Sequence, residues 1–221
     1  ALLSLVVTGC DVEGFIDSQR YKEDFREVRA LKPGSRVTLE NHNGSVEIAG
    51  WARDEIEITG TKHAATEDLL KQVKIDIAVT PASVNIRTIP PADRQGMTGA
   101  KYIIHVPRKT ELDRIQSSNG SIRVSEVEGA ARLRTSNGAV RASSLVQSLE
   151  VLTSNGAVEV RDMKGDASVR TSNGTVSAEG VRGSLDATTT NGTIRVQLTD
   201  PAAEKPVRLQ TTNGGVDLRI D

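Results

Sequence analysis

The stretch TSNGAV occurs at Thr135–Val140 and again, letter for letter, at Thr153–Val158. Eighteen residues further on, Thr171–Val176 reads TSNGTV, and Thr189–Ile194 reads TTNGTI. Asn119-Gly120 keeps the same interval on the N-terminal side. A polar tetrapeptide repeated at a fixed interval, with varied residues between the copies, predicts one repeated structural unit.

Apolar residues stand at fixed distances from each repeated Asn, including the outlying Asn-Gly pairs at Asn43 and Asn213. Four residues before the Asn stand Leu39, Ile115, Leu133, Val151, Val169, Ala187 and Leu209, and three after it stand Val46, Ile122, Val140, Val158, Val176, Ile194 and Val216. Alternation with a period of two predicts short strands with one buried face. Each unit therefore holds two strands, one on either side of Asn-Gly.

Two arrangements of these strands fit the pattern. Asn-Gly between alternating strands is a strong hairpin signal, which favours an antiparallel β-meander or sandwich. In a β-solenoid, each unit is instead one coil stacked in parallel on the next, so equal positions lie above one another and Asn side chains form a ladder. Only stacking gives a reason to repeat Thr-Ser before Asn-Gly. We therefore expect an all-β, single-chain β-solenoid with coils of about 18 residues, with the antiparallel meander or sandwich as the alternative.

The TSNG segment is expected to form the corner of each coil. Gly would supply backbone freedom, Asn would tolerate a left-handed conformation, and the Thr, Ser and Asn side chains would bond along the stack. Repeated in every coil, the same residues would also make an exposed polar surface that a ligand could bind, which we call the corner stripe. The corner stripe consists of Asn43, Gly44, Ser118, Asn119, Gly120, Ser136, Asn137, Gly138, Ser154, Asn155, Gly156, Ser172, Asn173, Gly174, Thr190, Asn191, Gly192, Asn213 and Gly214.

The pattern divides the chain into four segments. Residues 1–10 are expected to be the remnant of a lipoprotein signal, and residues 11–34 a tether or a leading cap element. Residues 35–110 form an irregular N-terminal β part with a small inserted helix, since Ala64–Val73 has helix-forming composition. Residues 111–221 form the regular repeats. Terminal units of a solenoid are expected to be atypical because they must cover an open edge.

Cys10 is the single cysteine and follows an apolar run, Ala1–Val7. A short apolar run before small residues has the form of a secretory signal and its cleavage site. Val7–Cys10 (VTGC) also resembles the bacterial lipobox, in which the cysteine carries the lipid. A lipid on Cys10 would hold the protein outside the cytoplasm, on the periplasmic side of a bacterial membrane or at the cell surface. The alternative is a buried strand that ends at Cys10.

Composition and motifs argue against several classes of function. The net charge is −1 with 26% charged residues of both signs, so no basic face for nucleic acid is expected. His42, His63 and His105 share no ligand spacing, so we expect no metal and no cofactor. Carboxylates are scattered without a repeated pair, and no nucleophile motif occurs. We therefore expect no catalytic residues and no enzyme activity.

A family resemblance follows from particular residues. NGSVEI at Asn43–Ile48, then Gly50-Trp51, Tyr102–Pro107 and the serial Asn-Gly units resemble the bacterial putative-adhesin family, a domain of unknown function. The resemblance covers about residues 32 to 221. It implies a secreted, lipid-anchored or membrane-attached envelope protein with a β-solenoid fold, and it defines no catalytic residues.

The function expected from these observations is that of a non-enzymatic cell-envelope adhesin or interaction protein. Anchored to the membrane through Cys10, it would bind an envelope polysaccharide or protein by many weak contacts along the corner stripe. One alternative is a scaffold or regulatory component of envelope-stress sensing, which would bind a membrane protein near Trp51 and the Pro90–Gly99 loop. The other is a β-helical enzyme that acts on polysaccharide.

Overall fold

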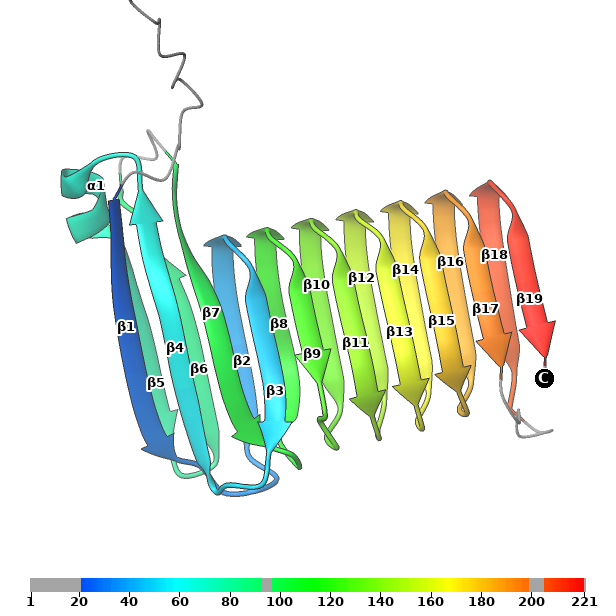
Figure 1. Cartoon of the computed structure of the whole chain (residues 1–221), viewed down its shortest axis with the longest axis horizontal. Helices are drawn as coiled ribbons and strands as arrows, with labels where there is room; N and C mark the ends of the chain where they lie inside the picture. The colour runs from blue at the N-terminus through cyan, green and yellow to red at the C-terminus, as the bar shows by residue number, and fades with distance from the viewer. Residues whose placement is uncertain (1–20, 93–96, 199–204, 221) are drawn as a thin grey trace, which may run out of the picture.

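The computed structural model describes residues 21–92, 97–198 and 205–220. They form two facing β-sheets of ten and nine strands, wound as a stack of flat coils (Figure 1). Each coil contributes one strand to each sheet, because a polar corner separates two strands that are apolar on one face only. The expected all-β solenoid with coils about 18 residues apart is confirmed.

The repeats pair in parallel, coil upon coil. Their strands are β8 (Glu111–Asn119), β9 (Ile122–Ser125), β10 (Ala131–Asn137), β11 (Val140–Leu145), β12 (Leu149–Asn155), β13 (Val158–Met163), β14 (Ala167–Asn173), β15 (Val176–Val181), β16 (Leu185–Asn191), β17 (Ile194–Leu198), β18 (Val207–Asn213) and β19 (Val216–Ile220). Between β10 and β12, Thr135 lies opposite Thr153 and Asn137 opposite Asn155. This register places equal positions above one another, so the antiparallel meander is wrong for the repeats.

The outlying Asn43-Gly44 pair belongs to the same stack. It joins β2 (Arg36–Asn43) to β3 (Val46–Trp51), and Asn43 is paired in register with Asn119 although 76 residues separate them in the chain. On its other side this coil packs in parallel against β6 (Ser83–Ile89) and β7 (Thr98–Pro107). The chain therefore inserts its first Asn-Gly coil between a later irregular coil and the regular repeats.

Antiparallel strands close the N-terminal end of the stack. β1 (Tyr21–Ala30) pairs with β4 (Glu55–Ala64), β4 pairs with β7, and β5 (Lys74–Thr80) pairs with β6. Residues 11–34, expected as a tether or a leading cap element, thus contain β1, the strand at this edge of the ten-stranded sheet. Residues 1–20, including Cys10, lie outside the described part of the chain. The expected helix is α1 (Glu67–Gln72), where the Thr66 side chain accepts a hydrogen bond from the Leu69 amide.

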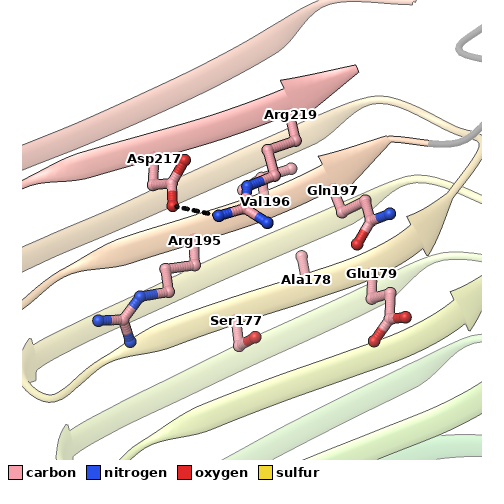
Figure 2. A pocket seen from close by; sticks show the side chains of 8 residues that line it. All are labelled: Ser177, Ala178, Glu179, Arg195, Val196, Gln197, Asp217 and Arg219. Carbon is pink, nitrogen blue, oxygen red and sulfur yellow. Dashed lines mark ion pairs between the residues drawn. The ribbon is translucent and has the colours of Figure 1, made fainter. Parts of the chain in front are cut away.

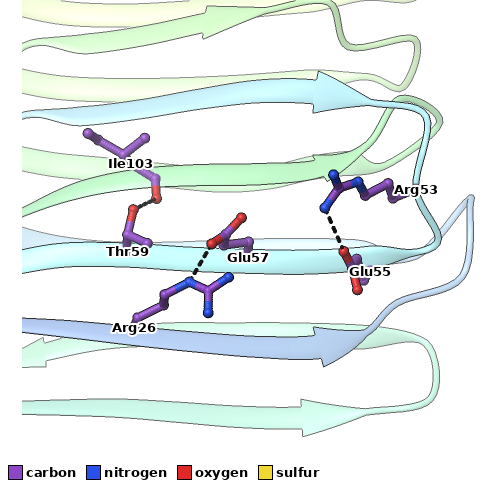
Figure 3. Close-up of polar contacts among 6 residues, drawn as sticks. All are labelled: Arg26, Arg53, Glu55, Glu57, Thr59 and Ile103. Carbon is purple, nitrogen blue, oxygen red and sulfur yellow. Dashed lines mark hydrogen bonds and ion pairs between the residues drawn. The ribbon is translucent and has the colours of Figure 1, made fainter.

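Polar contacts tie β1 and β7 to β4 across the outer face of this cap (Figure 3). Arg26 Nε lies 2.6 Å from Glu57 Oε1, which joins β1 to β4. The Thr59 hydroxyl donates a hydrogen bond of 2.9 Å to the Ile103 carbonyl oxygen and joins β4 to β7. Exposed pairs of this kind contribute little individually, about 0–1 kcal/mol, but they fill the outer face with polar groups.

The core is a thin apolar layer between the two sheets. Val, Ile, Leu and Ala supply nearly all of it, and Val140, Val158 and Val176 are at most 1% exposed. Rings enter only at the N-terminal end of the described core, where Phe25 and Tyr102 pack edge to face at 5.6 Å. Burial raises the pKa of Tyr102 to about 12. In the repeats, small and β-branched side chains fill the layer because two closely packed sheets leave no room for rings.

His63 at the end of β4 should make the stability of this cap depend on pH. It is 4% exposed, and its Nδ1 has no hydrogen-bond partner. Burial first, and then the charges of Lys101 and Lys22, lower the pKa of His63 from its usual 6.5. As pH falls below 6.5, the unfolded chain takes up the proton before the folded chain does. The free energy of unfolding should therefore decrease, by at most about 1.4 kcal/mol per pH unit.

Urea unfolding at about pH 7.5 and about pH 5.5 measures this effect. We expect His63→Gln to remove much of the difference between the two pH values, whereas His42→Gln, at an exposed position, should preserve it. An equal pH dependence in the wild type and His63→Gln would show that other groups control it.

Candidate functional site

The tight corners line one long edge of the solenoid, the upper edge in Figure 1. The Asn side chains there form an unbroken ladder: each Nδ2 donates to Oδ1 of the Asn one coil nearer the N-terminal end, at 2.7–2.9 Å. The members are Asn43, Asn119, Asn137, Asn155, Asn173, Asn191 and Asn213. At its N-terminal end, Asn43 Nδ2 donates to the Thr98 carbonyl oxygen at 2.8 Å. All the amides therefore point the same way.

A second row of hydrogen bonds lies beneath the amides. The Thr of each corner is inward-facing, and its hydroxyl donates to the corner-Gly carbonyl oxygen of the preceding coil at 3.0–3.5 Å. These residues are Thr135, Thr153, Thr171, Thr189 and Thr211. Thr and Asn thus bond along the stack, as the sequence predicted. Each corner needs a hydroxyl of this kind because a buried carbonyl without a partner is costly.

The corner glycines are required for a reason that the sequence analysis missed. A Cβ at Gly156 would lie 2.0 Å from the Gly138 carbonyl oxygen, and one at Gly174 would lie 2.1 Å from that of Gly156. These two glycines and the corner Asn residues do not have positive φ. The expectation of a left-handed Asn is therefore wrong, and conformational freedom does not explain Gly156 or Gly174, although Gly44 and Gly192 have φ of 122° and 158°. Close approach of successive coils excludes any side chain here.

In four of the coils the left-handed conformation occurs elsewhere. Glu126, Ser144 and Asp162 have φ of 56°, 56° and 52°, and Gly180 has φ of 67°. All four lie seven residues after the Asn of their coil. Of the four residues, only Gly180 indicates this conformation by its type, because Glu126, Ser144 and Asp162 adopt it at some cost.

The outward residues of the corner stripe form a row of hydroxyls beside the amides. Ser136, Ser154, Ser172 and Thr190 are exposed, and Ser118 is half-buried. We expected the serines to bond along the stack, but they face solvent instead. The structure therefore brings the predicted stripe residues together on one edge, with Thr and Gly holding the coils and with Asn, Ser and Thr190 at the surface.

The sequence model described as Toastrack DUF4097 matches residues 34–221. The chain belongs to this family. The expected resemblance is thereby confirmed.

Solved structures that match this chain come from several bacteria. A putative adhesin from Bacteroides fragilis NCTC 9343 is 14% identical, with 89% of this Toastrack chain and 97% of that chain covered and a TM-score of 0.48. A putative lipid binding protein from Parabacteroides distasonis ATCC 8503 is 13% identical, with 88% and 96% covered and a TM-score of 0.43. A putative cell adhesion protein from Clostridium sporogenes ATCC 15579 is 13% identical, with 90% and 100% covered and a TM-score of 0.33. No curated protein matches the sequence.

The sheet faces of the Toastrack domain carry charges of both signs. Arg141 Nε lies 3.1 Å from Glu159 Oε2, and Arg161 also contacts Glu159. Towards the C-terminal end, Arg195, Asp217 and neighbouring side chains line a shallow hollow of about 220 Å³ (Figure 2). Alternating charges pair across coils, which describes a solvated face better than a site for one charged ligand.

The remaining candidate residues do not converge. In the described part of the chain, no three His, Cys, Asp or Glu side chains come close enough to hold a metal ion. Trp51 is stacked on His105 at 5.0 Å, and Arg53 lies over its ring at 4.7 Å. Within the same residues, no helix has the length and apolar character needed to cross a membrane. Cys10, the predicted lipidation site, lies outside the described residues.

Proposed function

We propose that this chain is a non-enzymatic, extracytoplasmic interaction protein that binds a hydroxyl-rich polymer, such as an envelope polysaccharide, along the corner stripe. The observation that carries the proposal is the unbroken Asn ladder with its adjacent row of hydroxyls, one of each in every coil of the regular repeats. No other described surface repeats identical polar groups in every coil of the repeats.

The chemistry of the stripe suits a neutral polymer. Each ladder amide uses one N–H and one lone pair within the ladder, which leaves one donor and one acceptor site for a ligand. The stripe residues of the repeats are uncharged, whereas Arg and Glu lie on the sheet faces. Neighbouring coils are about 4.8 Å apart, so the same pair of groups recurs along the whole edge. Such a row offers aligned contacts to a repeating molecule.

The affinity for a polymer would come from the number of hydrogen bonds and from the rigidity of the corner stripe. A single hydrogen bond exchanged with water contributes only about 0.5–1.5 kcal/mol, and one corner alone would bind weakly. The ladder fixes the amides before binding, so little side-chain freedom is lost when a ligand arrives. When several corners bind one polymer chain, each contact after the first forms within the same complex, so the contacts together give a higher affinity than one corner alone. The proposal therefore requires at least several adjacent coils.

The proposed location rests on the sequence around Cys10. Val7–Cys10 resembles a lipobox, and a lipid there would place the stack at a membrane surface outside the cytoplasm. Mass spectrometry of membrane-extracted protein checks this, because a lipid-free Cys10 in the mature chain would exclude the anchor.

The test compares wild type with a variant that carries Ser136→Lys, Ser154→Lys and Ser172→Lys. We expect the three lysines to cover the neighbouring amides and to lower binding at least about tenfold. The measurement is co-sedimentation with purified envelope polysaccharide and with intact cells. The matched control carries Ser125→Lys, Ser143→Lys and Ser177→Lys, which add the same charge to the strands of the other sheet.

Three results decide the outcome. Loss in the stripe variant alone, with both variants folded by circular dichroism, would support the proposal. Equal binding by all three proteins would contradict a site at the corners. No binding by wild type would reject polysaccharide as the ligand and favour a protein partner. The envelope-stress scaffold, which would use the surface near Trp51, would then be the next hypothesis to test.

A further inference from the structure

The C-terminal coil leaves the apolar core open. Inward-facing residues of β17 are at most 3% exposed, whereas their equivalents in β19 are 43–64% exposed. The β17 residues are Ile194, Val196 and Leu198, and those of β19 are Val216, Leu218 and Ile220. Apolar side chains at a core position with this exposure form an exposed apolar patch, which is typical of an interaction surface.

The backbone of this coil is also unpaired on one side. β18 and β19 are the terminal strands of their sheets, and among the described strands each pairs with one neighbour only. The opposite end of the stack differs, since antiparallel strands and α1 lie there. An uncovered, regular edge with apolar side chains is a template for another strand.

The sequence of β19 identifies the strand that would fit. Val216–Ile220 reads VDLRI. In an antiparallel pair of two such strands centred on Leu218, Val216 lies opposite the partner's Ile220, and Asp217 lies opposite the partner's Arg219. Every inward position then meets an apolar residue, and each outward charge meets its opposite. We propose that the C-terminal coil binds a second copy of this chain end to end, related to the first by a two-fold axis through Leu218.

The other sheet obeys the same symmetry. Leu209 of β18 lies four residues before Asn213, and Leu218 lies four residues after Gly214. An axis that passes through Leu218 therefore passes through Leu209 on the opposite sheet. There Leu209 would lie opposite the partner's Leu209, and Val207 opposite the partner's Thr211. Both edges are satisfied by one rotation, which gives a closed dimer rather than an open fibre.

The charges of β19 are in place for this pairing. Asp217 Oδ2 and Arg219 Nη2 lie 3.6 Å apart on the outer face of the sheet, and both are exposed (Figure 2). A second strand across the axis would convert this single pair into a group of two positive and two negative charges. Like charges directly opposite one another are destabilising across a strand pair, so parallel or shifted pairing is disfavoured.

Charge reversal tests the proposal sharply. In Asp217→Arg both charges of β19 are positive, and in Arg219→Asp both are negative, so each variant would face its own copy with like charges. We expect wild type to be a dimer by analytical ultracentrifugation under reducing conditions, and each single variant to dimerise on the order of tenfold more weakly. The double reversal should dimerise as wild type does, and an equimolar mixture of the two single variants should form the mixed dimer.

A second pair of variants separates folding from association. Leu218→Lys places a charge at the axis and should give a folded monomer, whereas Leu152→Lys, at a side chain that is 39% exposed on the other sheet, should remain a dimer. A monomeric wild type over the whole concentration series would overturn the proposal. So would single variants that dimerise as wild type does, or an open-ended polymer. Because these measurements contain no polysaccharide, their outcome is independent of the proposed function.

Discussion

Gly156→Ala is expected to lower the free energy of unfolding by at least about 3 kcal/mol. The added Cβ would lie 2.0 Å from the Gly138 carbonyl oxygen and 2.6 Å from its carbon. Both are backbone atoms held by the parallel pairing of neighbouring coils, so neither moves without the loss of hydrogen bonds. The substitution must separate the coils at the corner, where Gly156 N also donates to the Asn173 carbonyl oxygen at 3.1 Å. The added methyl group would therefore disturb the contacts of this coil with both neighbouring coils.

Urea unfolding followed by circular dichroism measures this change. The matched control is Gly215→Ala, because a Cβ at Gly215 meets nothing within 4 Å and the equivalent position of an earlier coil is already Ala157. We expect the control to stay within about 1 kcal/mol of wild type. Equal effects of the two substitutions would show that close approach of the coils is not what selects glycine at the corner.

Two carboxylates in adjacent rungs of the ladder should produce the second large effect. Asn137→Asp combined with Asn155→Asp removes two donors and replaces a 2.9 Å hydrogen bond by two facing carboxylates. We expect a loss of about 3 kcal/mol at neutral pH, of which roughly half comes from the missing hydrogen bonds and half from repulsion. Repulsion raises the pKa of the pair in the folded state. The deficit should therefore shrink as pH falls from neutral towards about 4, the ordinary pKa of Asp in the unfolded chain.

The control places the same two substitutions farther apart. Asn119→Asp with Asn173→Asp also removes two donors, but three coil spacings of about 4.8 Å separate the carboxylates, which is more than a Debye length. We expect about half the destabilisation of the adjacent pair at neutral pH and no difference between the pairs below about pH 4. Equal losses at neutral pH would mean that the Asn side chains do not face one another as a ladder.

The architecture of the repeats follows from periodicity in the sequence. Val140 and Val158 stand at equal distances from their Asn residues, and only parallel stacking brings equal positions together at a constant interval. The same logic assigned Asn137 and Asn155 to one ladder. The expectation that Thr153 bonds along the stack is also met, since its hydroxyl donates to the Gly138 carbonyl oxygen of the preceding coil.

Other features depend on contacts that no local pattern contains. Asn43 has the repeated motif, but its place next to Asn119 depends on how the intervening 75 residues fold. The role of Gly156 is set by the distance to another coil, whereas the turn preference of Asn-Gly is local and suggested a different cause. The strand Tyr21–Ala30 is charged and weakly patterned because it covers an end of the sheet, where little apolar surface is buried.

The uniform orientation of the ladder amides gives the corner edge a polarity. At the N-terminal end of the ladder, Asn43 Nδ2 donates to the Thr98 carbonyl oxygen. At the C-terminal end, Asn213 Nδ2 donates to Asn191 Oδ1, and no further Asn among the described residues donates to Asn213 Oδ1. Small dipoles that point the same way add along a row, as they do along a helix. A molecule with a direction of its own would meet this edge in two orientations that are not equivalent. A polymer bound as proposed would thus have its head distinguished from its tail by this edge.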